Sequence, residues 1–384
     1  MSETQLASSS AVYKWRRDFY EEYTRKSGFS AYMGKSQDNI IRIVTDLLNE
    51  PGKGINIPLI MALRGAGVTG SQILVGNEED LNNYNDQVTV DWIRNAVVVP
   101  KSTSAYTGIP LWNAAKAANR NWAMRKLKND IIDSFGSIII PAANTGTFDT
   151  SVLYAAATTG QKNTYLTNNS DRILFGSATA NGSSNVWATA TATVDSTNDR
   201  MTTTVAELAK RMAENTGPDA SAGLSVTTRP AITPYTTTDG VYTGFVMFCA
   251  PNAFRDVQND TAMVSANRDA RAREGASYKN NPLFMDGDLL KDGIIYRKIP
   301  ELRRLTLINA GASGTTNVDR NFLCGLSALT LGYGQMVRAT EKKEDDYGFR
   351  PGTGVEELRG MKKTSYQGTN YGLVEVLTAS VDDA

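Results

Sequence analysis

The chain contains no histidine among its 384 residues. Histidine is the side chain that titrates near neutrality without perturbation, and it is the commonest ligand of zinc and copper. Its absence therefore excludes Ser-His-Asp and Cys-His catalysis. Net charge is also lacking, since 40 basic residues are balanced by 40 acidic ones. A dedicated nucleic-acid binder carries a strong basic excess, so we expect any contact with nucleic acid to be local and salt-sensitive.

Cysteine and long apolar runs are scarce as well. The two cysteines, Cys249 and Cys324, each lie inside a short apolar run, where a small buried thiol is the usual interpretation. A disulfide between them stays open, but two cysteines do not form the framework of a secreted protein, so we expect a reducing cytoplasm. No window reaches the ~18 apolar residues of a membrane span, and residues 1–10 are polar, so neither membrane insertion nor secretion is expected.

Motifs for cofactors and metals are weak or missing. Gly65, Gly67 and Gly70 match the G-x-G-x-x-G pattern of dinucleotide-binding proteins, but Gly76 interrupts the helix that should follow. The sequence has no phosphate-binding G-x-x-x-x-G-K-[ST] segment and no cluster of metal ligands. The acidic groups at 78–80 and 344–346 lack the aromatic platform of a sugar-binding cleft, which favours solvated loops or ion-pair partners. The sequence predicts no enzyme activity, no metal and no cofactor.

The length and the 41% hydrophobic content are typical of a folded chain with two or three packed subdomains. Strand and helix signals do not alternate as they do in a doubly wound parallel sheet, which predicts an α+β fold. Helices are expected from Ser36 to Pro51, over 108–135 and from Thr204 to Asn215. Strands are expected at 55–63, 88–99, 244–250, 293–299, 321–331 and 371–377.

Two of the expected strands enclose a long polar excursion. Residues 64–87, between the strands at 55–63 and 88–99, are polar and rich in glycine, and Pro58 confines the first strand to an edge or an irregular position. Loops above ~15 residues without structure of their own are uncommon in compact domains and are usually functional or ordered by a partner. The pattern therefore predicts an arm that leaves the body and returns, which points away from a monomeric enzyme.

The expected helix at 108–135 changes its apolar face along its length. Leu111 and Trp122 share one side, whereas Leu127 and Phe135 lie nearly opposite, so the helix should contact different partners at its two ends or break between them. Seven basic residues and no acidic one lie between Arg94 and Lys128, which indicates a surface that faces a polyanion; a solvated face paired with acids elsewhere is the alternative. The candidate DNA-facing residues are Lys116, Arg120, Arg125, Lys126 and Lys128.

Two further segments are candidates for contacts between subunits. Trp15, Phe19 and Tyr23 recur at a spacing of four and form an aromatic stripe, which could pack on the body of a monomer or on a neighbour in an assembly. The run from 268 to 274 alternates in charge and could form ion pairs with a neighbouring subunit, although exposed pairs contribute only about 0–1 kcal/mol each. The basic residues of this run are Arg268, Arg271 and Arg273.

Residues 142–200 consist mainly of Ala, Thr, Ser, Asn and Gly. Stretches such as 186–194 favour strands, so this segment is expected to be an inserted, β-rich surface segment that is too polar to form core.

Several strings in the same order resemble the podovirus-type major capsid protein family, over roughly residues 36 to 300. The first group comprises Gly54 to Leu59, Leu63 to Gly70, Leu74 to Leu81 and Tyr84 to Asp86. The second group comprises Ile232 to Thr236, Asp239 and Gly240, Phe245 to Phe248, Ala250 and Pro251, and Asn280 to Phe284.

The resemblance implies a Hong Kong 97-type phage capsid fold, which is an α+β fold. Its parts would be an N-terminal arm at 1–54, an extended β-hairpin arm (E-loop) at 55–100 and the spine helix of the peripheral domain at 101–136. The Ala/Thr/Ser-rich insertion would occupy 137–200, and 201–384 would complete the peripheral domain and form the axial domain.

The resemblance also implies a function. The chain would be a major capsid protein that self-assembles as pentamers and hexamers into an icosahedral head around double-stranded DNA, in the cytoplasm of a host bacterium. Portal, scaffold and decoration proteins would be its partners. We expect the arm to lie over an adjacent subunit and to contact it through Arg64, Glu78, Glu79 and Asp80. A non-viral nanocompartment shell of the same fold and a secreted, β-rich carbohydrate-active enzyme are the alternatives.

Overall fold

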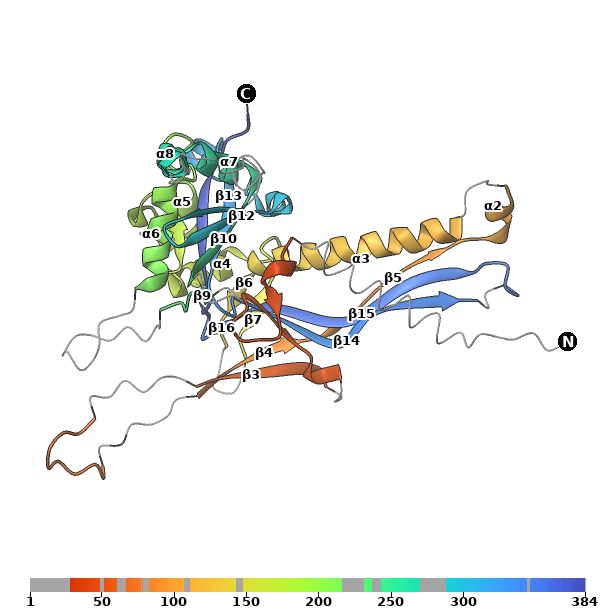
Figure 1. The fold of residues 1–384 in the computed structure, drawn as a ribbon, viewed down its shortest axis with the longest axis horizontal. Helices are drawn as coiled ribbons and strands as arrows, with labels where there is room; N and C mark the ends of the chain where they lie inside the picture. The colour runs from red at the N-terminus through yellow and green to blue at the C-terminus, as the bar shows by residue number, and fades with distance from the viewer. Residues whose placement is uncertain are drawn as a thin grey trace.

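The molecule is elongated, with a globular part at one end (Figure 1). A long helix, α3 (Leu111–Phe135), runs away from this part beside three strands, and a β-hairpin points the other way (Figure 1). The computed structural model describes residues 28–48, 52–60, 67–76, 78, 83–106, 111–142, 148–215, 231–236, 243–269, 288–343 and 346–383.

A five-stranded sheet forms the extended part of the molecule. Its two longest strands are antiparallel, and the sheet continues along them from the body to the far end, where the short helix α2 (Lys101–Tyr106) lies (Figure 1). The strand order is β1 (Met33–Gly34), β2 (Ile41–Val44), β14 (Leu329–Lys342), β15 (Gly352–Lys363) and β5 (Asp91–Val98).

Helix α3 packs on this sheet through one continuous stripe. Every fourth residue from Ala115 to Phe135 is buried, and the polar member, Asn119, donates from Nδ2 to the backbone oxygen of Thr353 in β15 at 2.9 Å. The expected break is absent, because this buried amide continues the stripe where the sequence shows no apolar residue. The two ends do contact different partners: β5 and β15 flank the helix, whereas Phe135 enters the core of the globular part.

A second sheet forms the globular part. Helices α6 (Thr203–Glu214) and α7 (Pro251–Asn259) pack on it, as does the 3-10 helix η6 (Pro300–Leu305). Helix α8 (Thr261–Asp269) packs on α7, and the 3-10 helix η7 (Ala312–Gly314) precedes β13. The strand order is β11 (Leu289–Lys291), β12 (Ile294–Lys298), β10 (Thr243–Cys249), β13 (Asn317–Cys324), β18 (Leu373–Ser380) and β8 (Ile173–Phe175), with β9 (Tyr235–Thr236) paired to β10.

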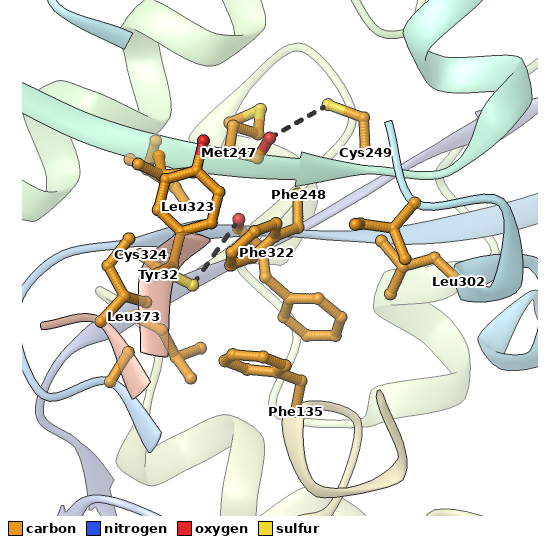
Figure 2. Packing of buried hydrophobic residues seen from close by; sticks show 14 of the residues in the cluster. Tyr32, Phe135, Met247, Phe248, Cys249, Leu302, Phe322, Leu323, Cys324 and Leu373 are labelled. Carbon is orange, nitrogen blue, oxygen red and sulfur yellow. Dashed lines mark hydrogen bonds between the residues drawn. The ribbon is translucent and has the colours of Figure 1, made fainter. Parts of the chain in front are cut away.

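The main hydrophobic core joins α3 to the second sheet. The rings of Phe135 and Phe322 stack with centroids 5.5 Å apart, and Phe248 packs beside them at 5.8 Å from Phe135 (Figure 2). Cys249 and Cys324 lie in this core on the adjacent strands β10 and β13, and both are free thiols whose pKa values are raised by burial (Figure 2). The interpretation as small buried thiols is confirmed, and the disulfide does not form.

The expected arm begins as an antiparallel hairpin. Among the described strands, β3 (Gly54–Ile60) and β4 (Asn83–Thr89) pair only with each other, so Pro58, opposite Asn85, lies in an edge strand as expected. A small apolar cluster of Val44, Ile55, Ile57 and Val88 lies at the base of the hairpin, which fixes its attachment to the body.

The segment expected to be β-rich is mixed instead, and that expectation is wrong. Residues 186–194, expected as a strand, contain the helix α5 (Trp187–Thr191), because Trp187, Ala190 and Thr191 bury one helical face at spacings of three and four. The segment also has its own apolar core around Tyr165, Phe175 and Trp187. Its other elements are β6 (Ile138–Ile140), β7 (Thr150–Val152), α4 (Thr159–Asn168) and the 3-10 helix η3 (Thr179–Gly182).

Other expectations need smaller corrections. The helix expected from Ser36 is absent, because Ile41 and Val44 are buried in β2, a parallel partner of β14, and branched side chains suit a strand. The strand expected at 321–331 is two strands, β13 and β14. Helix α6 begins at Thr203, one residue before the expected start, and is capped by Thr202, whose hydroxyl accepts from the Val205 backbone N–H at 3.3 Å.

The remaining elements are short: the 3-10 helices η1 (Ser30–Tyr32) and η2 (Asp46–Leu48) and the hairpin of β16 (Ser365–Tyr366) and β17 (Thr369–Asn370). Among the residues described, no helix is both long and apolar enough to cross a membrane.

Candidate functional site

Several buried charges of the described residues are arranged as ion pairs. No group of three or more His, Cys, Asp or Glu side chains among these residues could hold a metal ion. The buried carboxylates of Asp86, Glu357 and Glu375 each contact a basic side chain instead. Removal of one partner from such a pair leaves the other charge buried without a partner, so these pairs fix the geometry of the elements that carry them. The features that can act on other molecules therefore lie at the surface.

The tip of the arm exposes a continuous apolar run. Ile73, Leu74 and Val75 are 73%, 57% and 80% exposed. Beside them, the backbone N–H of Gly76 donates to the Glu78 carboxylate at 2.6 Å. Adjacent large aliphatic side chains in water mark a surface that another molecule covers. The run is visible in the sequence, but the predicted contacts of the arm included the acidic residues that follow it and not the run itself.

A second exposed apolar group lies at the opposite end of the molecule, where β14 turns into β15. Tyr347 is fully exposed and Phe349 is half exposed. Asp346, Tyr347 and Gly348 all have positive φ, so a left-handed turn presents the two rings. Sequence reasoning considered only the acids of this loop, although two aromatic residues around a glycine were visible.

The basic residues of α3 are mostly engaged with carboxylates. Lys116 pairs with Glu341 at 3.0 Å, Lys126 with Asp130 at 2.6 Å and Lys128 with Glu301 at 2.5 Å. Arg120 is half-buried, and Arg125 is exposed and forms no ion pair with a described residue. These three pairs agree with the alternative prediction, in which the basic face of the helix is paired with acidic residues elsewhere in the chain. Arg125 presents the least compensated charge of the five.

The base of the arm is locked by a buried ionic contact. Lys362 of β15 donates from Nζ to the Asp86 carboxylate of β4 and to the backbone oxygen of Asp149 at 2.6 Å. The other Asp86 oxygen accepts from the Ser365 backbone N–H at 3.3 Å. The contacts join the arm, the extended sheet and the segment after β6, so they set the direction in which the arm leaves the body.

A second buried network joins the two sheets. Arg320 of β13 donates from Nε to Glu375 of β18 at 2.5 Å, and Tyr165 of α4 contacts the other Glu375 oxygen at 3.4 Å. Tyr165 also accepts from Lys363 at the end of β15, at 2.9 Å, and from Asn370 at 2.8 Å. Burial lowers the pKa of Lys363 to about 7. Neither network was predicted, because its members are far apart in the sequence.

Several predicted contact residues cannot be placed. Arg268 belongs to α8, but its side chain lies outside the part of the chain that is described. Glu78 is the single described member of the predicted arm contacts. Trp15, Phe19, Tyr23, Arg64, Glu79, Asp80, Arg271 and Arg273 lie outside the described residues.

An elongated subunit with exposed apolar groups at two extremities is organised to complete its packing against other molecules. The fold thus defines an assembly subunit. The chain belongs to the phage capsid protein family, because the family model described as "Phage capsid protein" matches residues 3–382. It is similar to a chain of the cyanophage Pam1 capsid asymmetric unit, with 32% identity, a TM-score of 0.81 and complete coverage of both chains.

More distant capsid structures share the fold. The capsid of Ralstonia phage GP4 matches with 21% identity and a TM-score of 0.69, over 94% of this chain and 92% of that one. The head of Helicobacter pylori bacteriophage KHP40 matches with 13% identity and a TM-score of 0.60, over 93% and 91%. No curated protein sequence matches. The expected α+β capsid fold and the role as a bacteriophage major capsid protein, a structural protein of the virion, are confirmed.

Proposed function

We propose that copies of this major capsid protein assemble as pentamers and hexamers into a closed icosahedral head around double-stranded DNA. The observation that carries the proposal is the position of the exposed apolar groups, Ile73 to Val75 at one extremity and Tyr347 with Phe349 at the other (Figure 1). Each group exposes apolar surface to water in a single subunit, and its burial against a neighbour is favourable. Groups at both ends allow each subunit to bind neighbours on two sides.

Contacts in such a lattice must be weak singly and strong together. Interfaces of about 1,600 Å² repeated by symmetry meet this need, because an incorrectly placed subunit can still dissociate. We assign the arm, which leaves the body through β3 and β4, to the contact over an adjacent subunit, with Glu78 as a polar contact beside the apolar run. The aromatic stripe of Trp15, Phe19 and Tyr23 is proposed as a further contact.

Packaged DNA would meet the inner surface through its phosphates alone, without recognition of base sequence. Arg125 of α3 is the strongest candidate for such a contact, because it is exposed and carries no partner carboxylate among the described residues. Lys116, Lys126 and Lys128 would first have to exchange their carboxylate partners for phosphates.

The same role implies further partners. A scaffold protein would guide curvature, a portal would occupy one vertex, and a decoration protein would bind the finished head; assembly would take place in the cytoplasm of the host bacterium. The role is structural and needs no catalysis. No observation favours a nanocompartment shell or a secreted carbohydrate-active enzyme.

The test compares two substitutions of exposed aliphatic residues. Val75→Asp places a charge in the apolar run of the arm, whereas Leu290→Asp does the same on β11 of the globular part, where Leu290 is also exposed. We expect Val75→Asp to yield soluble subunits without shells and Leu290→Asp to yield normal shells in electron micrographs. Normal shells from Val75→Asp would contradict the proposed arm contact.

A further inference from the structure

A cavity of about 650 Å³ opens beside the C-terminal end of α3, away from both apolar extremities. Its wall includes Gly136 after the helix, Leu153 and Tyr154 after β7, and Arg304 with the residues after η6. The volume lies within the range of small-molecule sites, ~300–1,000 Å³. Nothing in the proposed assembly uses this cavity.

The residues that line the cavity include Arg320, whose guanidinium group has unused donors. The Arg320 side chain is fully buried, and its Nε is bound to Glu375. No hydrogen-bond acceptor among the described residues contacts its Nη1 or Nη2. The rings of Tyr154 and Trp187 lie 4.8 Å and 5.9 Å from its central carbon. A buried donor without an acceptor is unfavourable, so both nitrogens favour a ligand that accepts hydrogen bonds.

The direction of this guanidinium follows from its neighbours. A Cβ atom at Gly136 would lie 3.2 Å from Nη1, and both Gly136 and Tyr154 line the cavity. Nη1 therefore lies against the Gly136 backbone, at a part of the cavity wall where a side chain at position 136 would crowd it. A planar guanidinium edge with two parallel donors is the geometry that binds a carboxylate in a bidentate manner.

The charges around the cavity favour an anion. Arg304 binds Asp133 through two contacts of 2.8 and 3.0 Å, which neutralises that pair at the wall. Lys162 lies 3.9 Å from the centre of the Tyr154 ring, and Arg320 helps to lower its pKa, after the larger effect of burial. With Arg320 opposed by Glu375, Lys162, which contacts the lining residue Tyr154 without lining the cavity itself, supplies a nearby positive charge that none of these carboxylates balances.

The rim is apolar. Leu153 is 55% exposed and Ile308 is 68% exposed, and both line the cavity. An apolar rim does not suit a hydrated phosphate, whereas it suits an aliphatic group. We propose that this cavity is a binding site for a carboxylate carried on a short aliphatic body, with the carboxylate on Arg320 and the aliphatic part against Leu153 and Ile308.

The direct test measures binding of 4-methylpentanoate to the full-length unassembled chain by titration calorimetry. A ligand of this size should bind with a Kd of about 1 mM. Its neutral amide, 4-methylpentanamide, should bind at least about tenfold more weakly, because it lacks the charge that strengthens the Arg320 hydrogen bonds. Equal binding of acid and amide, or no binding of the acid, would overturn the proposal.

Variants locate the site without removing Arg320. Gly136→Ala would place a methyl group 3.2 Å from Nη1 and 2.8 Å from the Leu305 side chain, and Ile308→Ser removes the aliphatic rim. Both should weaken binding about tenfold. Ile308 is exposed, so that variant keeps the fold even if Gly136→Ala does not. Arg303→Gln, one residue before Arg304 but outside the cavity, is the control and should bind as the parent does. Unchanged binding in Ile308→Ser would place the ligand elsewhere.

The source of the carboxylate is identified by repeating the titration on assembled shells. If a polypeptide of a neighbour or partner supplies it, shells should no longer bind the probe, whereas retained binding identifies a free small carboxylate. Both results require binding to the unassembled chain, and its absence there rejects the site whether or not shells form.

Discussion

Lys362 and Asp86 form a buried ion pair that connects the end of the extended sheet to the base of the arm. The two residues lie 276 positions apart in the sequence, and the lysine also donates to the backbone oxygen of Asp149. An arm that must reach a neighbour needs a defined exit angle. The pair supplies it, because neither charge can move without losing its partner in a dry environment.

Removal of this lysine should therefore be costly. We expect Lys362→Met to destabilise the unassembled chain by about 3–5 kcal/mol, since it leaves the Asp86 carboxylate buried without its cation. The double substitution Lys362→Met with Asp86→Asn should recover part of the loss. Urea unfolding of the two variants and the parent measures both effects. A single substitution as stable as the parent would show that the pair does not hold the arm.

The base of the arm also depends on a glycine in β15. A Cβ atom at Gly360 would lie 1.8 Å from the backbone oxygen of Thr89, so Gly360→Ala must displace the backbone between β4 and β5. We expect a loss of about 1–3 kcal/mol in the free energy of unfolding, and fewer shells. Gly352→Ala on the same strand is the matched control, because its Cβ would meet only atoms at 3.6 Å or beyond. Equal stability of the two variants would refute the close approach.

Stability should rise with pH through the titration of Lys363. Its folded pKa, about 7, lies below its ordinary value, so between these values the unfolded chain binds more protons than the folded chain. Glu375 opposes this shift, and Arg320 adds to it. We expect the free energy of unfolding to increase by ~1 kcal/mol per pH unit from pH 7 towards pH 9, relative to Lys363→Met. Parallel pH profiles of the parent and the variant would count against a neutral buried lysine.

The DNA-facing role of α3 is tested by neighbouring residues that differ in pairing. Arg125 has no carboxylate partner among the described residues, whereas Lys126 is paired with Asp130. Arg125→Gln should reduce the slope of log affinity against log salt by about one for duplex DNA, and Lys126→Gln should reduce it less. If the slope stays unchanged in Arg125→Gln, DNA meets another surface.

Sequence reasoning predicted features that depend on local order. An arm at 55–100 and a helix at 108–135 were predicted because their patterns are continuous along the chain, and the structure has a hairpin at 54–89 and a helix at 111–135. The second strand of the hairpin is β4, inside the excursion expected at 64–87, whereas most of the strand expected at 88–99 is β5, which pairs with β15. It failed where distant partners decide the outcome. Ile41 to Val44 form a strand because β14 lies beside them, and Trp187 lies in a helix because Tyr165 and Phe175 surround it. β15 was missed, since its many charged residues, such as Lys362 and Lys363, are buried by pairing with residues that the sequence places far away.

Among the surface features, the arm was predicted from its length, but the apolar run exposed at its tip was not. The two ionic networks could not be predicted, because each joins strands that are adjacent only after folding. The cavity at Arg320 depends on the close approach of its guanidinium to Gly136, which only the packed structure reveals.

Negative-stain electron microscopy of the chain, expressed alone and with a candidate scaffold protein, tests the central claim most directly. We predict closed shells, or rings of five and six subunits, in at least one of the two preparations. A monodisperse monomer in both would contradict the assembly of this chain into a head.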